Sequence, residues 1–261
     1  LNVVDGVVVA DELKGVGENL MDHLLVKRSY RTTSRQTLNV LMRNPASLAL
    51  AALRYGLFRS GPLAGGPAPL GGYTRTDARF ETPDIQFFYI PFDVDIFGAD
   101  LAPYSGFQIS FYKSRPEARG QLRIRSADPR EAPHIAINYL GTDSDTRTVI
   151  DGLRFVGRVG KGEALARFGA TEVLPGLAEE SDDALLDYAR GHGNTAYHHV
   201  GTCRIGTDAM AVVDPQLRVH GISRLRVADG SVMPALPTAN THAACVMIGE
   251  KCADMLRNRK P

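Results

Sequence analysis

The sequence has few cysteines and almost no net charge. Its three cysteines are Cys203, Cys245 and Cys252, and no two of them have the CxxC spacing. Neither a disulfide framework nor a zinc site is indicated, and reduced thiols in the cytoplasm fit this cysteine usage. Lys and Arg total 30 against 29 for Asp and Glu. The chain therefore lacks the excess charge that would favour binding to nucleic acid or to an anionic membrane.

Long apolar runs are also missing. The most apolar stretch lies within PASLALAALRYGLF, from Ala46 to Leu53, and is far shorter than the roughly 20 residues that a membrane span requires. We interpret it as a buried or partly buried helix. The alternative is a surface that contacts a membrane. No transmembrane segment is predicted. The expected location is the cytoplasm, with membrane association left open.

Four segments have the apolar spacing of helices. The first contains Pro45, where a break is expected because proline cannot donate within a helix. Another is preceded by Ser181, a typical N-cap residue. The predicted helices cover 37–58, 143–168, 181–190 and 242–257.

Other segments are typical of strands. Runs of β-branched and aromatic residues bounded by Pro or Gly predict strands at 84–90 and 107–112, and an alternating run predicts one at 120–126. We expect these three to form an antiparallel sheet. Shorter strands are predicted within 1–10 and at 225–229. The fold class is therefore α+β, with the sheet flanked by helices.

Histidines are concentrated in the last third of the chain, at positions 192, 198, 199, 220 and 242. A metal site is not predicted, because there is no HExxH spacing and no acidic ligand cluster. His198 and His199 are adjacent, and on a strand their side chains would point in opposite directions. We expect His199 to have a structural role.

Motifs along the whole chain resemble one family in their order and spacing. The N-terminal part contains GVGENLMDH (15–23), GPLAGGPAPLGGY (61–73) and QLRIRSADPREAPHIAINYL (121–140). The last third contains YHHVGTCRIG (197–206), LRVHG (217–221), LRVADGSVMP (225–234), NTH (240–242) and MIGEKCAD (247–254). These motifs resemble the C-terminal half of the glucose–methanol–choline oxidoreductases, which use FAD to oxidise the CH–OH group of alcohols.

The resemblance implies a catalytic pair, His198 and His242. In the family, the first histidine faces the alcohol beside the flavin, and a neutral imidazole can accept a hydroxyl proton. Loss of that proton makes the carbon a hydride donor to the flavin. His242 matches a position that carries His or Asn, and would hold the substrate oxygen by a hydrogen bond.

The resemblance also implies cofactor contacts. Asn240 and Thr241 precede the last helix, whose positive end suits the flavin pyrimidine. Asp229 and Gly230 match the segment that meets the pyrophosphate and ribitol, and Asn19 lies in the cofactor-covering loop.

The family's GxGxxG turn, which seats the pyrophosphate, is missing from the sequence. The segment 157–162, GRVGKG, has the wrong spacing and is interpreted as a loop. We therefore expect an N-terminal FAD-binding half to complete the protein. The predicted domains are 1–24 as the cofactor-covering loop and link from the FAD domain, 25–195 as the substrate-binding domain, and 196–261 as the C-terminal part of the FAD domain.

The substrate is less defined. Choline-oxidising members carry a glutamate near the position of Pro69, whereas this chain has Ala68-Pro69-Leu70 and no tryptophan. A quaternary ammonium needs a counter-charge or an aromatic cage, so a neutral alcohol is favoured. Phe87, Phe88, Tyr89 and Phe92 would line an apolar pocket or pack in the sheet.

The electron acceptor is left open. The alternatives are a cyanohydrin lyase on the same scaffold and a non-catalytic fragment.

Overall fold

The computed structural model describes residues 3–4, 7–8, 12–94, 100–178 and 180–257. The chain divides into two compact units. The histidine unit comprises 1–23, 115–145 and 195–261, and the sheet unit comprises 24–114 and 146–194. Residues 115–145 therefore belong to the same compact unit as the two ends of the chain. The functional division at 24/25 and 195/196 remains a prediction.

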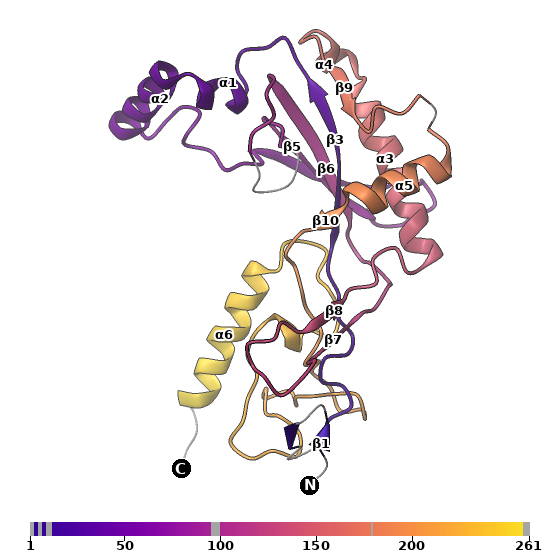
Figure 1. Ribbon diagram of the computed structural model, residues 1–261. Coiled ribbons are helices and arrows are strands. Elements are labelled where there is room, and N and C mark those ends of the chain that lie inside the picture. Colours follow the sequence, from indigo (N-terminus) through magenta and orange to yellow (C-terminus); the bar gives the residue numbers. More distant parts are fainter. Residues whose placement is uncertain (1–2, 5–6, 9–11, 95–99, 179, 258–261) are drawn as a thin grey trace. The chain divides into compact units, whose positions relative to one another are not determined.

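The sheet unit is built on an antiparallel sheet, which confirms the predicted α+β class (Figure 1). The strand order is β10-β3-β6-β5-β4, and β9 also pairs with β3. The strands are β3 (Leu24–Arg31), β4 (Leu70–Thr74), β5 (Ile85–Ile90), β6 (Gly106–Lys113), β9 (Thr171–Leu174) and β10 (Asn194–Thr195). The predicted strands at 84–90 and 107–112 thus correspond to β5 and β6, which are direct neighbours.

One face of this sheet packs against helix α3 (Asp143–Gly160). A Cβ added at Gly152 would lie 2.1 Å from the Phe111 ring, and one at Gly160 would lie 2.0 Å from the Tyr30 hydroxyl. Glycine at these positions lets the helix approach the sheet closely.

The segment 157–162 was predicted to be a loop, but residues 157–160 form the last turn of α3. Packing against β3 extends the helix through these glycines.

The same face buries the guanidinium group of Arg28. Nη1 donates to Glu172 at 2.7 Å and to Glu180 at 2.9 Å, and Nε donates to the Leu153 carbonyl at 2.9 Å. A buried charge is tolerated only when it is paired and hydrogen-bonded in this way. The buried Arg28 side chain therefore links β3 to α3 and β9 by hydrogen bonds.

The aromatic residues of β5 are divided between the two faces of the sheet. The ring centroid of Phe87 lies 5.6 Å from that of Phe155 in α3, and Tyr89 lies 5.3 Å from Phe107. Phe88, in between, lies 5.7 Å from Tyr112 instead. Alternation along the strand therefore places these rings in packing contacts, so they do not form one common apolar pocket.

The predicted helix 143–168 is divided in the structure, since α3 ends at Gly160 and a short separate helix, α4 (Glu163–Ala166), follows. The other helices of the sheet unit follow the predicted segments. They are α1 (Leu38–Arg43), α2 (Pro45–Phe58) and α5 (Asp182–His192). The predicted break falls at Asn44, between α1 and α2, and the Asn44 side chain accepts from Ser47 N–H at 3.1 Å. The side chain of Ser181 accepts from Ala184 N–H at 3.2 Å, which confirms it as the N-cap of α5.

Helix α2 was predicted to be buried or partly buried, and in the structure it is mostly exposed. Ala51 is its one buried residue, whereas Leu50, Leu53 and Leu57 are 68%, 58% and 65% exposed. Apolar content alone does not bury a helix unless another element covers it. Among the described residues no helix has the length and apolarity needed to cross a bilayer.

The histidine unit contains little regular structure. Strands β1 (Val3–Val4) and β2 (Val7–Val8) pair with each other, and the rest of the predicted strand within 1–10 lies outside the described residues. Strands β7 (Gln121–Arg123) and β8 (His134–Ala136) form a separate two-stranded sheet. The expectation that 120–126 joins the main sheet was therefore wrong.

Two further elements complete the histidine unit. They are the 3-10 turn η1 (Gly230–Val232) and helix α6 (His242–Arg257). Helix α6 begins and ends where the sequence predicts. The predicted strand 225–229 does not form, because in the described chain its backbone has only an isolated bridge between Arg226 and Arg218. A strand requires a continuous hydrogen-bonded partner.

The core of the histidine unit is apolar and draws on widely separated segments. Its members are Met21, Val200, Val212, Val213, Leu217, Val219, Val232, Met233, Leu236, Ile248 and Cys252. Met21 and Val200 belong to this core. Met21 lies two residues before His23, and Val200 lies two residues after His198. Core packing therefore fixes the backbone on which the candidate site is built.

Candidate active site around His198

Two segments far apart in the sequence lie antiparallel and bring His23 beside His198. Met21 and Val200 exchange both backbone hydrogen bonds at 3.0 Å, and Ala196 N–H donates to the His23 carbonyl at 3.0 Å. Between these two points the chain turns through Tyr197, whose φ of 59° is left-handed. This turn directs the His198 side chain into the interior, where it is 7% exposed.

The His198 imidazole has a hydrogen-bonding partner on each ring nitrogen. Nδ1 lies 2.9 Å from Nδ1 of His23, and the two rings are nearly perpendicular, at 87°. Nε2 lies 3.1 Å from the side-chain nitrogen of Asn240. Since an amide nitrogen can only donate, Nε2 is the acceptor and carries no proton. That is the state required of a base.

Asp22 holds the backbone around His198. Its Oδ1 accepts from the His198 backbone N–H at 2.8 Å. Its Oδ2 accepts from the Thr195 hydroxyl at 2.6 Å and from the Tyr139 hydroxyl. Burial, followed by the hydrogen bond to Asp22, raises the pKa of Tyr139, so this phenol stays a donor. The carboxylate is thus fully occupied as an acceptor from several segments.

Burial lowers the pKa of His198 below its ordinary value of 6.5. The negative charge of Asp22 acts in the opposite direction, and His199 lowers the pKa further. Desolvation is the largest effect because it disfavours the charged imidazolium. The imidazole is therefore neutral at pH 7 and able to take up a proton.

The neighbouring histidine is placed differently. His199 is exposed, and its Nε2 lies 3.6 Å from Oδ2 of Asp22. The buried His198 and the exposed His199 therefore differ in environment, in agreement with the divergent directions expected for adjacent residues.

The turn before α6 contributes Asn240 rather than His242 to the immediate surroundings of His198. Asn240 donates to Nε2, and Thr241 is buried with its carbonyl accepting from Cys245 N–H at 2.9 Å. His242 is the exposed first residue of α6. Within the part of the chain that is described, no hydrogen bond joins it to His198. Its role as the second catalytic histidine remains a prediction.

The other predicted cofactor residues have backbone roles in the structure. Asp229 caps η1 by accepting from Ser231 N–H at 2.8 Å. Gly230 is buried, and an added Cβ would lie 3.3 Å from both the Cys245 Sγ and the His199 carbonyl oxygen. Asn19 bonds to the Gly201 carbonyl at 3.4 Å and accepts from Arg119 at 3.1 Å. These contacts shape the chain near His198, and flavin contact stays a prediction.

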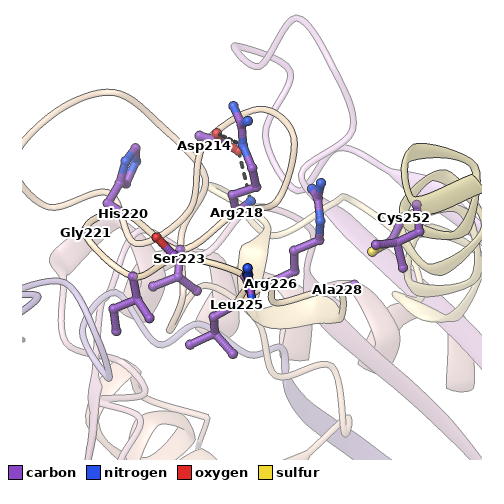
Figure 2. A pocket seen from close by; sticks show the side chains of 13 residues that line it. Asp214, Arg218, His220, Gly221, Ser223, Leu225, Arg226, Ala228 and Cys252 are labelled. Atoms are coloured by element: carbon purple, nitrogen blue, oxygen red, sulfur yellow. Dashed lines mark hydrogen bonds and ion pairs between the residues drawn. The ribbon is translucent and has the colours of Figure 1, made fainter. Parts of the chain in front are cut away.

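The histidine unit also has an open pocket of about 940 Å³, shown in Figure 2. Asp214, Arg218, His220, Arg224 and Arg226 are among its lining residues, and Arg218 donates to Asp214 at 2.7 Å. None of the predicted site residues lines it. The residues that meet at His198 therefore form a separate site.

The sequence did not predict Asp22 and His23 as site residues. Both end the motif GVGENLMDH, from which only Asn19 was selected. Their signal was a carboxylate next to a histidine at the end of a family motif. Their partner lies 175 residues away from His23, and no local pattern indicates that contact. Among the described residues no group of three or more His, Cys, Asp or Glu side chains is arranged to hold a metal ion.

Comparisons with known proteins define the family. The family model described as GMC oxidoreductase matches residues 116–249. Proteins named oxygen-dependent choline dehydrogenase are similar: the one from Pseudomonas syringae pv. tomato is 38% identical over all 261 residues, and the one from Cronobacter sakazakii is 36% identical over 97% of the chain. The chain spans 46% and 45% of their respective lengths.

Solved structures agree with this assignment. A formate oxidase from Aspergillus oryzae, whose description refers to FAD modification, gives a TM-score of 0.87 at 27% identity, with 97% of this chain and 49% of that chain covered. Pyridoxine 4-oxidase from Mesorbium loti gives 0.80 at 26% identity, with 98% and 46% covered. The chain belongs to the GMC oxidoreductase family, which confirms the resemblance found in the sequence. It spans about half the length of the relatives that it matches.

Proposed function

We propose that the protein carrying this chain is an FAD-dependent oxidoreductase that oxidises the CH–OH group of an alcohol, with His198 as the general base. The observation that supports this most directly is the buried His198 imidazole, whose Nε2 lies 3.1 Å from the Asn240 amide nitrogen. That amide nitrogen is a donor, so we infer that Nε2 is an acceptor without a proton. An alcohol hydroxyl is a donor of the same kind. Transfer of its proton to Nε2 leaves an electron-rich carbon that can release hydride.

The residues near His198 suit a flavin. FAD, when bound, supplies the acceptor for the hydride. The turn at Asn240 and Thr241 opens the 16-residue helix α6, whose first N–H groups have no acceptor within the helix and carry partial positive charge. Such donors favour a ring that gains negative charge. Asp229, Gly230 and Asn19 complete the proposed cofactor contacts, and His242 is proposed to hold the substrate oxygen.

The other two functions considered have less support. The relatives and structures named above are dehydrogenases and oxidases, so the cyanohydrin lyase has no support from them. A purely structural role does not require a buried histidine whose Nε2 accepts at 3.1 Å from a side chain on a different segment. An N-terminal FAD-binding half is proposed as the partner that completes the site, because the chain spans 46% of its relatives.

The decisive experiment is anaerobic reduction of the flavin by an alcohol in the FAD-loaded protein. The wild-type absorbance should bleach, and His198→Ala should slow bleaching by about 10² or more, the contribution typical of a general base. His192→Ala is the matched control, because His192 is an exposed histidine at the end of α5. No bleaching with any alcohol, or an unchanged rate in His198→Ala, would refute the proposal.

Membrane association is a proposal of its own, supported by α2. Leu50, Leu53 and Leu57 are exposed, and no Asp or Glu occurs between Asp22 and Asp77. An exposed apolar helix without acidic residues suits an interfacial position on an anionic bilayer. Replacing the three leucines with Gln should lower flotation with phosphatidylserine-containing vesicles at least about 10-fold. Equal flotation of both proteins would argue against α2 as the contact.

A further inference from the structure

We infer that His23 and Asp22 are positioning residues for His198: His23 holds the His198 ring in the tautomer with the proton on Nδ1, and Asp22 fixes the backbone that carries it. This inference deepens the proposed function and rests on it. Neither residue needs to touch the alcohol or the cofactor for this role. Both act through His198.

The proton count around the two rings leads to one arrangement. Nε2 of His198 accepts from the Asn240 amide at 3.1 Å, so the proton of the neutral ring is on Nδ1. This Nδ1–H points to Nδ1 of His23 at 2.9 Å, which must then be an acceptor. His23 therefore carries its own proton on Nε2. The tautomer of a histidine is set by the hydrogen bond on its other nitrogen.

Burial makes this preference strong. His23 is fully buried, and His198 is 7% exposed. Bulk water therefore cannot replace a lost acceptor at Nδ1. A buried N–H without a partner is costly, more than the net gain from a hydrogen bond that water could replace. Without His23, the alternative tautomer with the proton on Nε2 becomes competitive, and that tautomer cannot accept a proton from an alcohol at Nε2.

Asp22 controls the second variable, the position of the ring. It accepts from the His198 backbone N–H at 2.8 Å and from Thr195 at 2.6 Å. Thr195 in turn accepts from Tyr197 N–H at 2.9 Å. The left-handed turn that directs His198 inward is therefore tied to a single buried carboxylate. Because Asp22 and His23 are consecutive, one short segment sets both the backbone and the tautomer.

The direct test is the protonation pattern of His198, read from two- and three-bond ¹⁵N–¹H couplings in the ¹⁵N-histidine-labelled, FAD-loaded protein. His198→Gln assigns the signals. In the wild type at pH 7, Nδ1 should give the shift of a protonated nitrogen and Nε2 that of an unprotonated one. A proton on Nε2 in the wild type would overturn the inference, whether or not any alcohol reduces the flavin.

Two variants of His23 separate positioning from general damage. His23→Leu removes the acceptor and should move part of the His198 population to the Nε2-protonated tautomer. His23→Asn offers a carbonyl oxygen close to the position of Nδ1 and should restore the wild-type pattern. His192→Leu removes an exposed histidine of α5 and should leave the His198 signals unchanged. A wild-type pattern in His23→Leu would contradict the proposed role.

Kinetics supply the second readout. His23→Leu should slow flavin reduction about 5-fold, since the hydrogen bond that favours the reactive tautomer has a net value of about 1 kcal/mol. The loss should fall on the rate constant for reduction, with the apparent dissociation constant of the alcohol unchanged. His23→Asn should recover most of the rate. An effect on alcohol binding alone would contradict a positioning role. If no alcohol reduces the flavin, the proposed function fails, and the coupling pattern still decides the tautomer.

Discussion

At the scale of single residues, two opposing effects set the pKa of His198, the proposed base. Burial lowers its pKa, and the carboxylate of Asp22 raises it. Desolvation prevails because Asp22 meets the backbone N–H of His198 and not its ring. Its charge is also shared with the hydroxyls of Thr195 and Tyr139. The ring therefore stays neutral, although a carboxylate lies one hydrogen bond away.

The lowered pKa of His198 predicts the pH dependence of alcohol oxidation. The proposed reaction requires the neutral imidazole of His198, and a pKa lowered from 6.5 keeps that form populated on the acid side of neutrality. The rate of flavin reduction should therefore fall at acid pH, with the midpoint of that fall below pH 6.5. Stopped-flow measurements across pH 5–9 check this, with pH limits chosen around the ordinary histidine pKa of about 6.5. An acid limb centred above that value would contradict it.

Replacing Asp22 with Asn should destabilise the histidine unit. An amide has one acceptor oxygen, and its NH₂ group would face the Thr195 and Tyr139 hydroxyls, which donate to Asp22 in the wild type. The loss should be about 3 kcal/mol, the value of a buried hydrogen bond to a charged group. Asp128→Asn is the control, because Asp128 pairs with Arg130 at the surface. Urea denaturation should show a much lower midpoint for Asp22→Asn alone.

At the scale of secondary structure elements, the glycines of two helices in the sheet unit have different surroundings. Gly152 in α3 allows contact with the Phe111 ring, whereas Gly56 in α2 has no atom within 4 Å of an added Cβ. The same residue type is therefore required by packing in one helix and is only a weak helix former in the other. The exposure of α2 and the close packing of α3 account for the difference (Figure 1).

The pair Gly152→Ala and Gly56→Ala tests this directly. The first variant adds a methyl group that would lie 2.1 Å from Phe111, and overpacking of this kind should cost about 1–3 kcal/mol. The second should leave stability unchanged or raise it by about 0.5–1 kcal/mol, because alanine favours helix. Thermal unfolding of both variants measures the difference. Equal destabilisation by the two substitutions would argue against close packing of α3 on the sheet.

At the scale of the whole molecule, the relatives and the sequence suggest different substrates. The relatives named above are choline dehydrogenases, whereas the segment Ala68-Pro69-Leu70 carries no carboxylate and is exposed. A trimethylammonium group needs an opposite charge or aromatic faces. The proposed oxidation concerns the CH–OH group, and the region around Pro69 is proposed to decide which remote part of the alcohol is accepted.

We therefore predict a preference for neutral primary alcohols over choline. In the FAD-loaded protein, kcat/KM for a neutral primary alcohol should exceed that for choline by about 10-fold or more, because an unpaired cation loses about 1–2 kcal/mol of attraction. Pro69→Glu should raise kcat/KM for choline, and Pro69→Gln should not. Higher activity of the wild type with choline would show that another group recognises the cation.

The sequence by itself determined the family, the fold class and the elements that depend on local signals. Helix 242–257 and the Ser181 cap were correct to the residue, since apolar spacing and capping act within a few residues. Contacts between distant segments were decided only by tertiary structure. The segment 120–126 pairs with β8, residues 225–229 lack a continuous partner, and α2 remains uncovered. His198 was recognised from its motif, but Asp22 and His23, which set its position and tautomer, lie about 175 residues away. Hydrogen bonds depend on distance in space, and only the folded backbone brings these groups together.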